Sequence, residues 1–112
     1  MTIDVYQQYF AAKAEVNGIE RRACSVLLQS DSENGEITYR VIVNLFPHRD
    51  EEDYGITYDA YYEEVIYQGK GRRSRKKEKM YREEMLRPVA ERLIEGIGTI
   101  EWDRPLREAR ID

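Results

Sequence analysis

The sequence predicts an α+β fold: a four-stranded, mostly antiparallel β-meander with one long C-terminal amphipathic helix on one face, followed by a short strand or tail. Three observations support this prediction. Apolar and polar residues alternate through most of the first 67 residues, as in half-buried strands. From about residue 74 the apolar spacing becomes helical. The whole chain, residues 1–112, has the length of a single domain with one core.

The first two strands, residues 5–16 and 19–29, are predicted to form a hairpin. Asn17-Gly18 separates them, and both residues tolerate the positive φ angles of a type I′ turn. In the first strand the alternating small or apolar residues are Tyr6, Phe10, Ala12, Ala14 and Val16. In the second, one face is expected to hold Cys24, Val26 and Leu28, and the other Ala23 and Leu27.

The third strand, residues 36–46, has the clearest alternation in the chain and follows a polar turn at residues 30–35. Pro47 ends it, because proline lacks an amide donor. The fourth strand, residues 56–67, is rich in tyrosine. Its two faces are expected to hold Tyr58, Tyr62 and Ile66 on one side, and Tyr61, Val65 and Tyr67 on the other.

The helix is predicted over residues 74–96. Its apolar stripe consists of Tyr81, Met85, Val89 and Leu93, spaced by four residues and supported by Met80, Leu86, Ala90, Ile94 and Ile97. Pro88 interrupts it and predicts a kink near Glu84, or a restart of the helix, because its ring clashes with the carbonyl four residues earlier. Gly96 and Gly98 end the helix. The tail, residues 99–112, opens with a short strand that ends at Trp102.

Charge is strongly segregated along this chain. Residues 70–79 connect the fourth strand to the helix, and we use the name basic arm for this connection together with its continuation to residue 82. The arm holds eight of the 18 basic residues and one acid, Glu78, and so carries +7. Since the chain carries −4 in total, the other residues carry −11. A cluster of like charges repels itself, which indicates an electrostatic partner.

The basic arm is the first candidate binding site. Guanidinium groups bind phosphate oxygens in pairs and lysines add positive charge, so the arm suits nucleic acid. The alternative is a solvated strand-to-helix connection. Cations at a helix N-terminus are locally unfavourable, which points to a functional role or to a segment that folds on binding. The predicted contact residues are Lys70, Arg72, Arg73, Arg75, Lys76, Lys77, Lys79 and Arg82, with Tyr61 and Tyr67 as stacking platforms.

The second cluster is an acidic patch, Asp50, Glu51, Glu52, Asp53, Asp59 and Glu63. Carboxylates beside His48 suit a hard divalent cation, but neighbouring acids on a loop diverge and there is no second histidine. We therefore predict a solvated loop without a metal or a small-molecule cofactor. Asp59 and Glu63 are separated by roughly 13 Å along a strand, too far to act as a catalytic pair.

Composition excludes several classes of protein. Cys24 is the single cysteine, so no disulfide can form within the chain, and a thiol in the middle of an apolar strand is expected to be inert. Nowhere do eighteen apolar residues follow one another, and the N-terminal residues have no pattern of a signal peptide. We expect a cytoplasmic protein without a membrane segment.

The leading hypothesis is a non-enzymatic binding module that contacts nucleic acid or a nucleoprotein complex through the basic arm. The alternative is a small acidic inhibitor or regulator that mimics nucleic acid and occupies the groove of a nucleic-acid-binding protein, for example a host-defence nuclease. That version requires the acidic patch and Glu64 to form one surface. A third interpretation is a homodimer in which the arm of one copy pairs with the acids of another.

Overall fold

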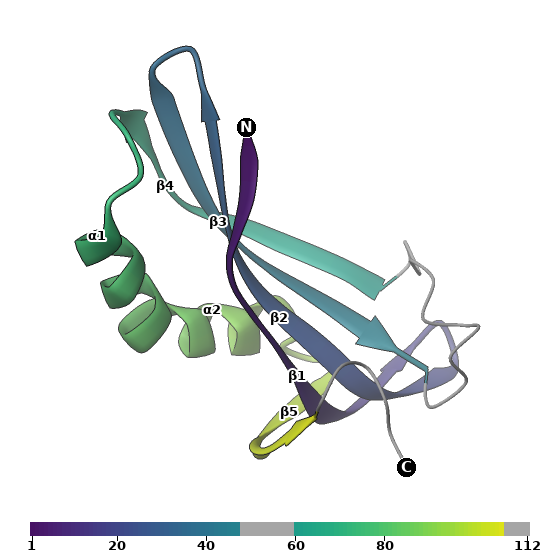
Figure 1. Cartoon of the computed structure of the whole chain (residues 1–112). Coiled ribbons are helices and arrows are strands. Elements are labelled where there is room, and N and C mark those ends of the chain that lie inside the picture. The colour runs from purple at the N-terminus through teal and green to yellow at the C-terminus, as the bar shows by residue number, and fades with distance from the viewer. Residues whose placement is uncertain (48–59, 107–112) are drawn as a thin grey trace.

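The computed structural model describes residues 1–47 and 60–106. A sheet and a helical segment form two layers, with the helices on one face of the sheet (Figure 1). In chain order the elements are β1 (Thr2–Val16), β2 (Ile19–Glu33), β3 (Glu36–Phe46), β4 (Tyr61–Lys70), α1 (Arg75–Met80), the π-helical turn η3 (Tyr81–Met85), α2 (Leu86–Leu93) and β5 (Gly98–Leu106).

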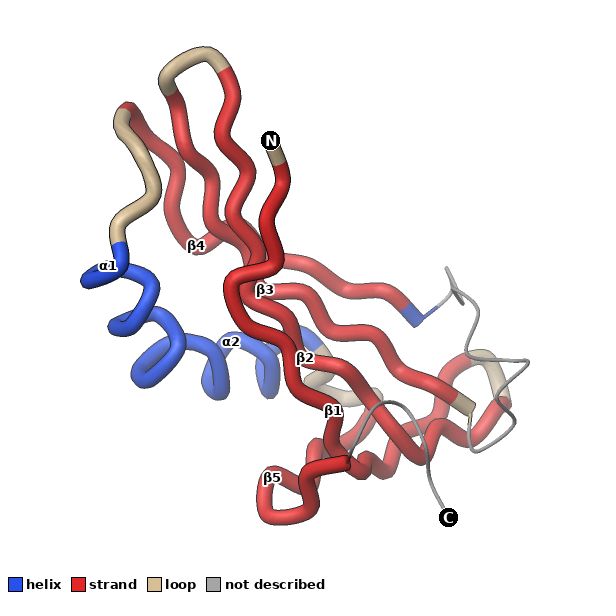
Figure 2. The backbone as a smooth tube through the Cα atoms, viewed as in Figure 1, coloured by secondary structure: helices blue, strands red, loops and turns tan. Residues whose placement is uncertain are grey.

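The structure confirms the α+β class but has a five-stranded sheet, where a four-stranded meander with a short C-terminal strand or tail was predicted. The antiparallel sheet has the order β4-β3-β2-β1-β5, and β5 pairs with the Tyr9–Ala14 part of β1 (Figure 2). Ile100 is buried opposite Ala12, so the C-terminal segment completes the core. Its alternation is short and ends in Asp103-Arg104-Pro105, which explains why the sequence indicated only a short strand before the tail.

Two Asn-Gly pairs make the hairpin turns. Asn17 and Gly18 have φ angles of 54° and 78°, which confirms the predicted type I′ geometry. Asn34 and Gly35 repeat it with φ angles of 52° and 77°. The second turn therefore has two central residues, not the six of the predicted polar turn, and β2 continues to Glu33 instead of ending near residue 29.

The main core lies between the sheet and the helices. Cys24, Val26 and Leu28 are fully buried in it, as predicted for one face of β2. Ala23 belongs to a small cluster with Phe46 on the opposite face. The helical segment and its C-cap bury Tyr81, Leu86, Val89, Ala90 and Ile94 in the core, with Met85 and Leu93 partly buried beside them. This confirms the predicted apolar stripe except at Met80, which is 42% exposed.

Two β-bulges bring additional side chains to the helical face. In β1 the pairing passes from Asp4↔Gln29 to Tyr6↔Leu28, so Val5 is the inserted residue. In β4 it passes from Val65↔Arg40 to Tyr67↔Tyr39, so the insertion is Ile66. Val5 and Tyr6 both pack against the core, as do Ile66 and Tyr67. The bulge in β4 corrects our prediction that Tyr67 shares a face with Tyr61 and Val65.

The helical segment runs from Arg75 to Leu93, within the predicted range of 74–96. The irregularity expected at Glu84 takes the form of the π-helical turn η3, in which the Leu86 amide donates to the Tyr81 carbonyl. This wider turn contains Glu84, whose carbonyl the ring of Pro88 would meet in a regular helix. No helix in the described part of the chain is both long and apolar enough to cross a bilayer.

Candidate nucleic-acid interface

The basic arm begins in the sheet. Lys70 is the last residue of β4 and pairs with Glu36 across the strands. Gly71 then adopts a φ of 132°, which is open to glycine, and its amide donates to the Gly35 carbonyl at 3.0 Å. The arm therefore starts beside the tip of the β2–β3 hairpin, and its direction is fixed by backbone bonds.

Ser74 starts the helix. Its side-chain oxygen accepts a hydrogen bond from the Lys77 amide at 3.2 Å, the usual bond of an N-cap serine. Its own amide donates to the Tyr39 hydroxyl at 3.1 Å. The cap thus joins the first helical turn to strand β3 in the core.

The single acid of the arm, Glu78, bonds the arm to strand β3. Glu78 is 7% exposed and accepts hydrogen bonds from Arg73 Nε at 2.9 Å, Arg73 Nη2 at 3.0 Å and the Tyr39 hydroxyl at 2.8 Å. Burial by itself raises the pKa of Glu78, but the Arg73 and Tyr39 hydrogen bonds and the charges of Arg73 and Arg75 outweigh it, and the pKa is lowered. Burial, aided by Glu78, also raises the pKa of Tyr39 to about 12. Glu78 is therefore ionised and neutralises Arg73.

The other cations of the arm are exposed. None of them forms an ion pair with an acid in residues 1–47 or 60–106. They are Lys70, Arg72, Arg75, Lys76, Lys77, Lys79 and Arg82. Together they give this end of the molecule a positive charge that is not cancelled locally.

Two of these cations lie on tyrosine rings supplied by the two bulges. Lys77 Nζ is 4.2 Å from the ring centre of Tyr67, and Arg82 Cζ is 4.3 Å from that of Tyr6. Tyr39 and Tyr81 pack edge to face with ring centres 5.1 Å apart, and both lie beside the ring of Tyr67. Sequence reasoning found Tyr67 but missed Tyr6, for which the adjacent apolar residues Val5 and Tyr6 were the available signal.

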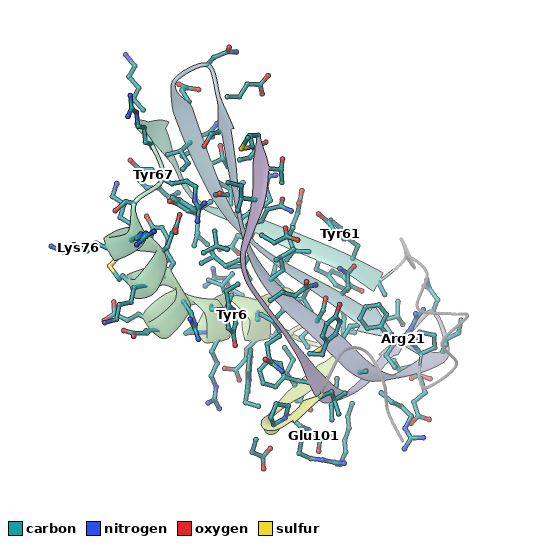
Figure 3. All side chains as sticks on the ribbon, viewed as in Figure 1. Tyr6, Arg21, Tyr61, Tyr67, Lys76 and Glu101 are labelled. Carbon is teal, nitrogen blue, oxygen red and sulfur yellow. The ribbon has the colours of Figure 1, made fainter. Side chains whose placement is uncertain are left out.

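The second predicted platform, Tyr61, lies away from the arm. It stands at the start of β4, on the opposite face from Tyr67, and is 41% exposed. Figure 3 shows Tyr61 far from Lys76 and Tyr67. Its hydroxyl donates to Glu63 at 2.8 Å, and Glu63 also faces Arg40 at 4.0 Å. The structure therefore brings one of the two predicted tyrosines to the arm.

Most of the acidic patch, Asp50 to Asp53 with Asp59, lies outside the described residues. Glu63 and Glu64 lie on opposite faces of β4, and Glu64 forms an ion pair with Arg92 on α2. This arrangement does not favour a single acidic surface that includes both. In the described part of the chain, no three acids, histidines or cysteines are grouped as a metal site would require.

Cys24 is not placed for chemistry. It is fully buried in the core, and burial raises the pKa of its thiol to about 12. The thiolate needed of a nucleophile is therefore scarce at neutral pH.

A groove lies between the arm and the N-terminal half of β1. It has a volume of about 430 Å³, and its lining residues are Val5, Arg75, Glu78, Lys79, Arg82 and Glu83. Three cations of the arm thus face one concave space.

No protein-family model, curated protein or solved structure matches this chain. Fold and local chemistry are therefore what bear on its function.

Proposed function

We propose that this chain is a non-enzymatic binding module that contacts nucleic acid, alone or in a nucleoprotein complex, through the basic arm. One observation carries the proposal: seven exposed cations lie on one ordered segment without an acid partner in the described residues. An arm that merely connected two elements would gain stability from local acids, yet its one acid is already bound by Arg73 and Tyr39.

Phosphate is the counter-charge that suits this arrangement. Lysine and arginine side chains displace counterions from a nucleic-acid backbone, and this release supplies much of the binding free energy. Hydrogen bonds at Ser74 and Gly71 fix the backbone of the arm before a ligand arrives, so binding does not have to order it. Because the rest of the chain carries −11, contact is confined to the arm and does not extend over the body.

The contacts within the arm support different roles for its residues. Arg73 is a structural residue, since both of its hydrogen bonds go to Glu78. Lys77 covers the ring of Tyr67, so this tyrosine positions a cation in place of stacking on a base. Phosphate contact is assigned to the other exposed cations of the arm, Lys70, Arg72, Arg75, Lys76, Lys79 and Arg82.

The test is fluorescence anisotropy with labelled single-stranded and duplex RNA and DNA at two salt concentrations. The arm variant changes Arg72, Arg75, Lys76 and Lys79 to glutamine and keeps Arg73, so that Glu78 stays paired. The matched control changes four exposed cations elsewhere to glutamine: Lys13, Arg22, Arg87 and Arg104. Both variants lose the same charge.

We expect the wild-type chain and the control to bind, with an affinity that falls steeply as salt rises. The logarithm of the binding constant falls linearly with the logarithm of the salt concentration, and each phosphate contact on a single strand contributes about 0.7 to this slope. Loss of four contacts in the arm variant should therefore reduce the slope by up to about 3. Equal losses in the two variants would show that net charge, and not the arm, governs binding. Absence of binding at low salt would reject the proposal and leave an acidic inhibitor, or self-association, as the interpretation to pursue.

A further inference from the structure

The groove beside the arm is built by three features that meet at one place. Arg75, Lys79 and Arg82 follow one another at intervals of four and three residues, which places them on one side of the helical segment. The bulge at Val5 turns that side chain toward them and makes it the apolar floor of the groove. Strand β5 pairs with β1 only from Tyr9 onward, so β5 does not extend to Val5.

The charges that face the groove suit a phosphate group. Among the lining residues, Glu78 is neutralised by Arg73, and this leaves three cations and the exposed Glu83. The balance is therefore two positive charges, which matches a phosphate monoester at neutral pH.

A neighbouring tyrosine positions the guanidinium group of Arg82. Tyr6, brought to the helical face by the same bulge, lies 4.3 Å from the centre of its guanidinium group and fixes that group by a cation–π contact. Figure 3 shows Tyr6 beside the helical segment. No acceptor in the described residues takes the guanidinium N–H groups of Arg82, so they are available to phosphate oxygens.

We propose that this groove binds one nucleotide, with its phosphate on Arg75, Lys79 and Arg82 and its nucleoside against Val5. The volume of about 430 Å³ lies within the range of roughly 300–1,000 Å³ that holds small ligands. This inference rests on the proposed function when the nucleotide is the phosphorylated end of a strand. A free nucleotide offers the same chemistry, and the experiment separates the two sources.

The experiment measures binding of a nucleoside monophosphate, of a 5′-phosphorylated oligonucleotide and of the same oligonucleotide with a 5′-hydroxyl. The groove variant changes Lys79 and Arg82 to glutamine. Its matched control changes Lys13 and Arg22 to glutamine, which removes the same charge from exposed positions outside the arm and the groove. A third variant, Val5→Phe, fills the groove and leaves every charge in place.

We expect the groove variant and Val5→Phe each to lower the affinity for the monophosphate at least about tenfold. The control should keep an affinity within about twofold of the wild type. The 5′-phosphorylated strand should bind better than the 5′-hydroxyl strand to the wild type but not to the groove variant. If strands bind through the arm but the monophosphate does not bind, or binds the wild type and the groove variant equally, the inference is wrong and the proposed function survives. If the monophosphate binds in the groove and strands do not, the groove is a site for a free nucleotide and the proposed function fails.

Discussion

Arg73 and Glu78 form a bidentate ion pair, with Nε–Oε2 and Nη2–Oε1 distances of 2.9 and 3.0 Å, at the point where the basic arm meets the sheet. The Tyr39 hydroxyl completes the site from strand β3. The pair closes a loop across the N-cap of the helix, so the first turn is fixed to the core. The arm is therefore part of the fold, and its conformation depends on one carboxylate.

Glu78→Gln should lower the free energy of unfolding by about 1–3 kcal/mol, because a neutral amide loses two charge-assisted bonds from Arg73 and leaves that guanidinium without its anion. Urea denaturation followed by circular dichroism measures this change. The control is Glu83→Gln on the exposed side of the same helix. Similar losses in the two variants would mean that the ion pair adds nothing specific.

The stability contributed by Glu78 should depend on pH. Since the pKa of this carboxyl is lowered in the folded chain, its contribution is complete above its ordinary value of 4.5 and is lost as pH falls below that value through the folded pKa. The difference in unfolding free energy between the wild type and Glu78→Gln should therefore be constant at neutral pH and shrink below about 4.5. A difference that grows in acid would contradict this assignment.

Cys24 should resist thiol reagents in the folded protein. Its thiol is buried and its pKa is raised to about 12, so both access and the thiolate fraction are low at pH 8. Absorbance with a disulfide reagent should show little reaction under native conditions and one equivalent in denaturant. Rapid labelling of the native chain would show that this part of the sheet opens readily.

Gly98→Ala should be among the most damaging small substitutions in the chain. A Cβ atom there would lie 2.2 Å from the Lys13 carbonyl oxygen and 2.4 Å from the Ala14 Cβ atom, so the backbones of β1 and β5 would have to separate. We expect a loss of more than about 2 kcal/mol in urea denaturation. Thr99→Ala, at the next and exposed position, is the control and should change stability by less than about 0.5 kcal/mol.

Much of the fold was predictable because its signals are local. The Asn17-Gly18 turn, the alternation in β3 and the helical stripe each depend on residues close together in the sequence. The two bulges and the pairing of β5 are not local. An inserted residue such as Ile66 reverses the alternation only relative to a partner strand, so the sequence pattern placed Tyr67 on the wrong face.

In the candidate site, too, the local features were predictable from the sequence and the long-range contacts were not. The charge of the arm is visible in the sequence, since its eight cations are close neighbours. The role of Glu78 was not predictable, because its partner Tyr39 lies 39 residues away. Nor was the groove, which needs the bulge at Val5 to face a helix some 70 residues later.

The π-helical turn η3 sets the rotation of the arm relative to the buried part of the helical segment. Upstream of Tyr81 the segment presents cations, and downstream of Met85 it buries Leu86, Val89 and Ala90. Each residue added to or removed from a helix rotates what precedes it by about 100°. A change of length at Glu83 or Glu84 would therefore rotate the arm about the helix axis relative to Leu86, Val89 and Ala90, and it would move Glu78 away from the Tyr39 hydroxyl in the core.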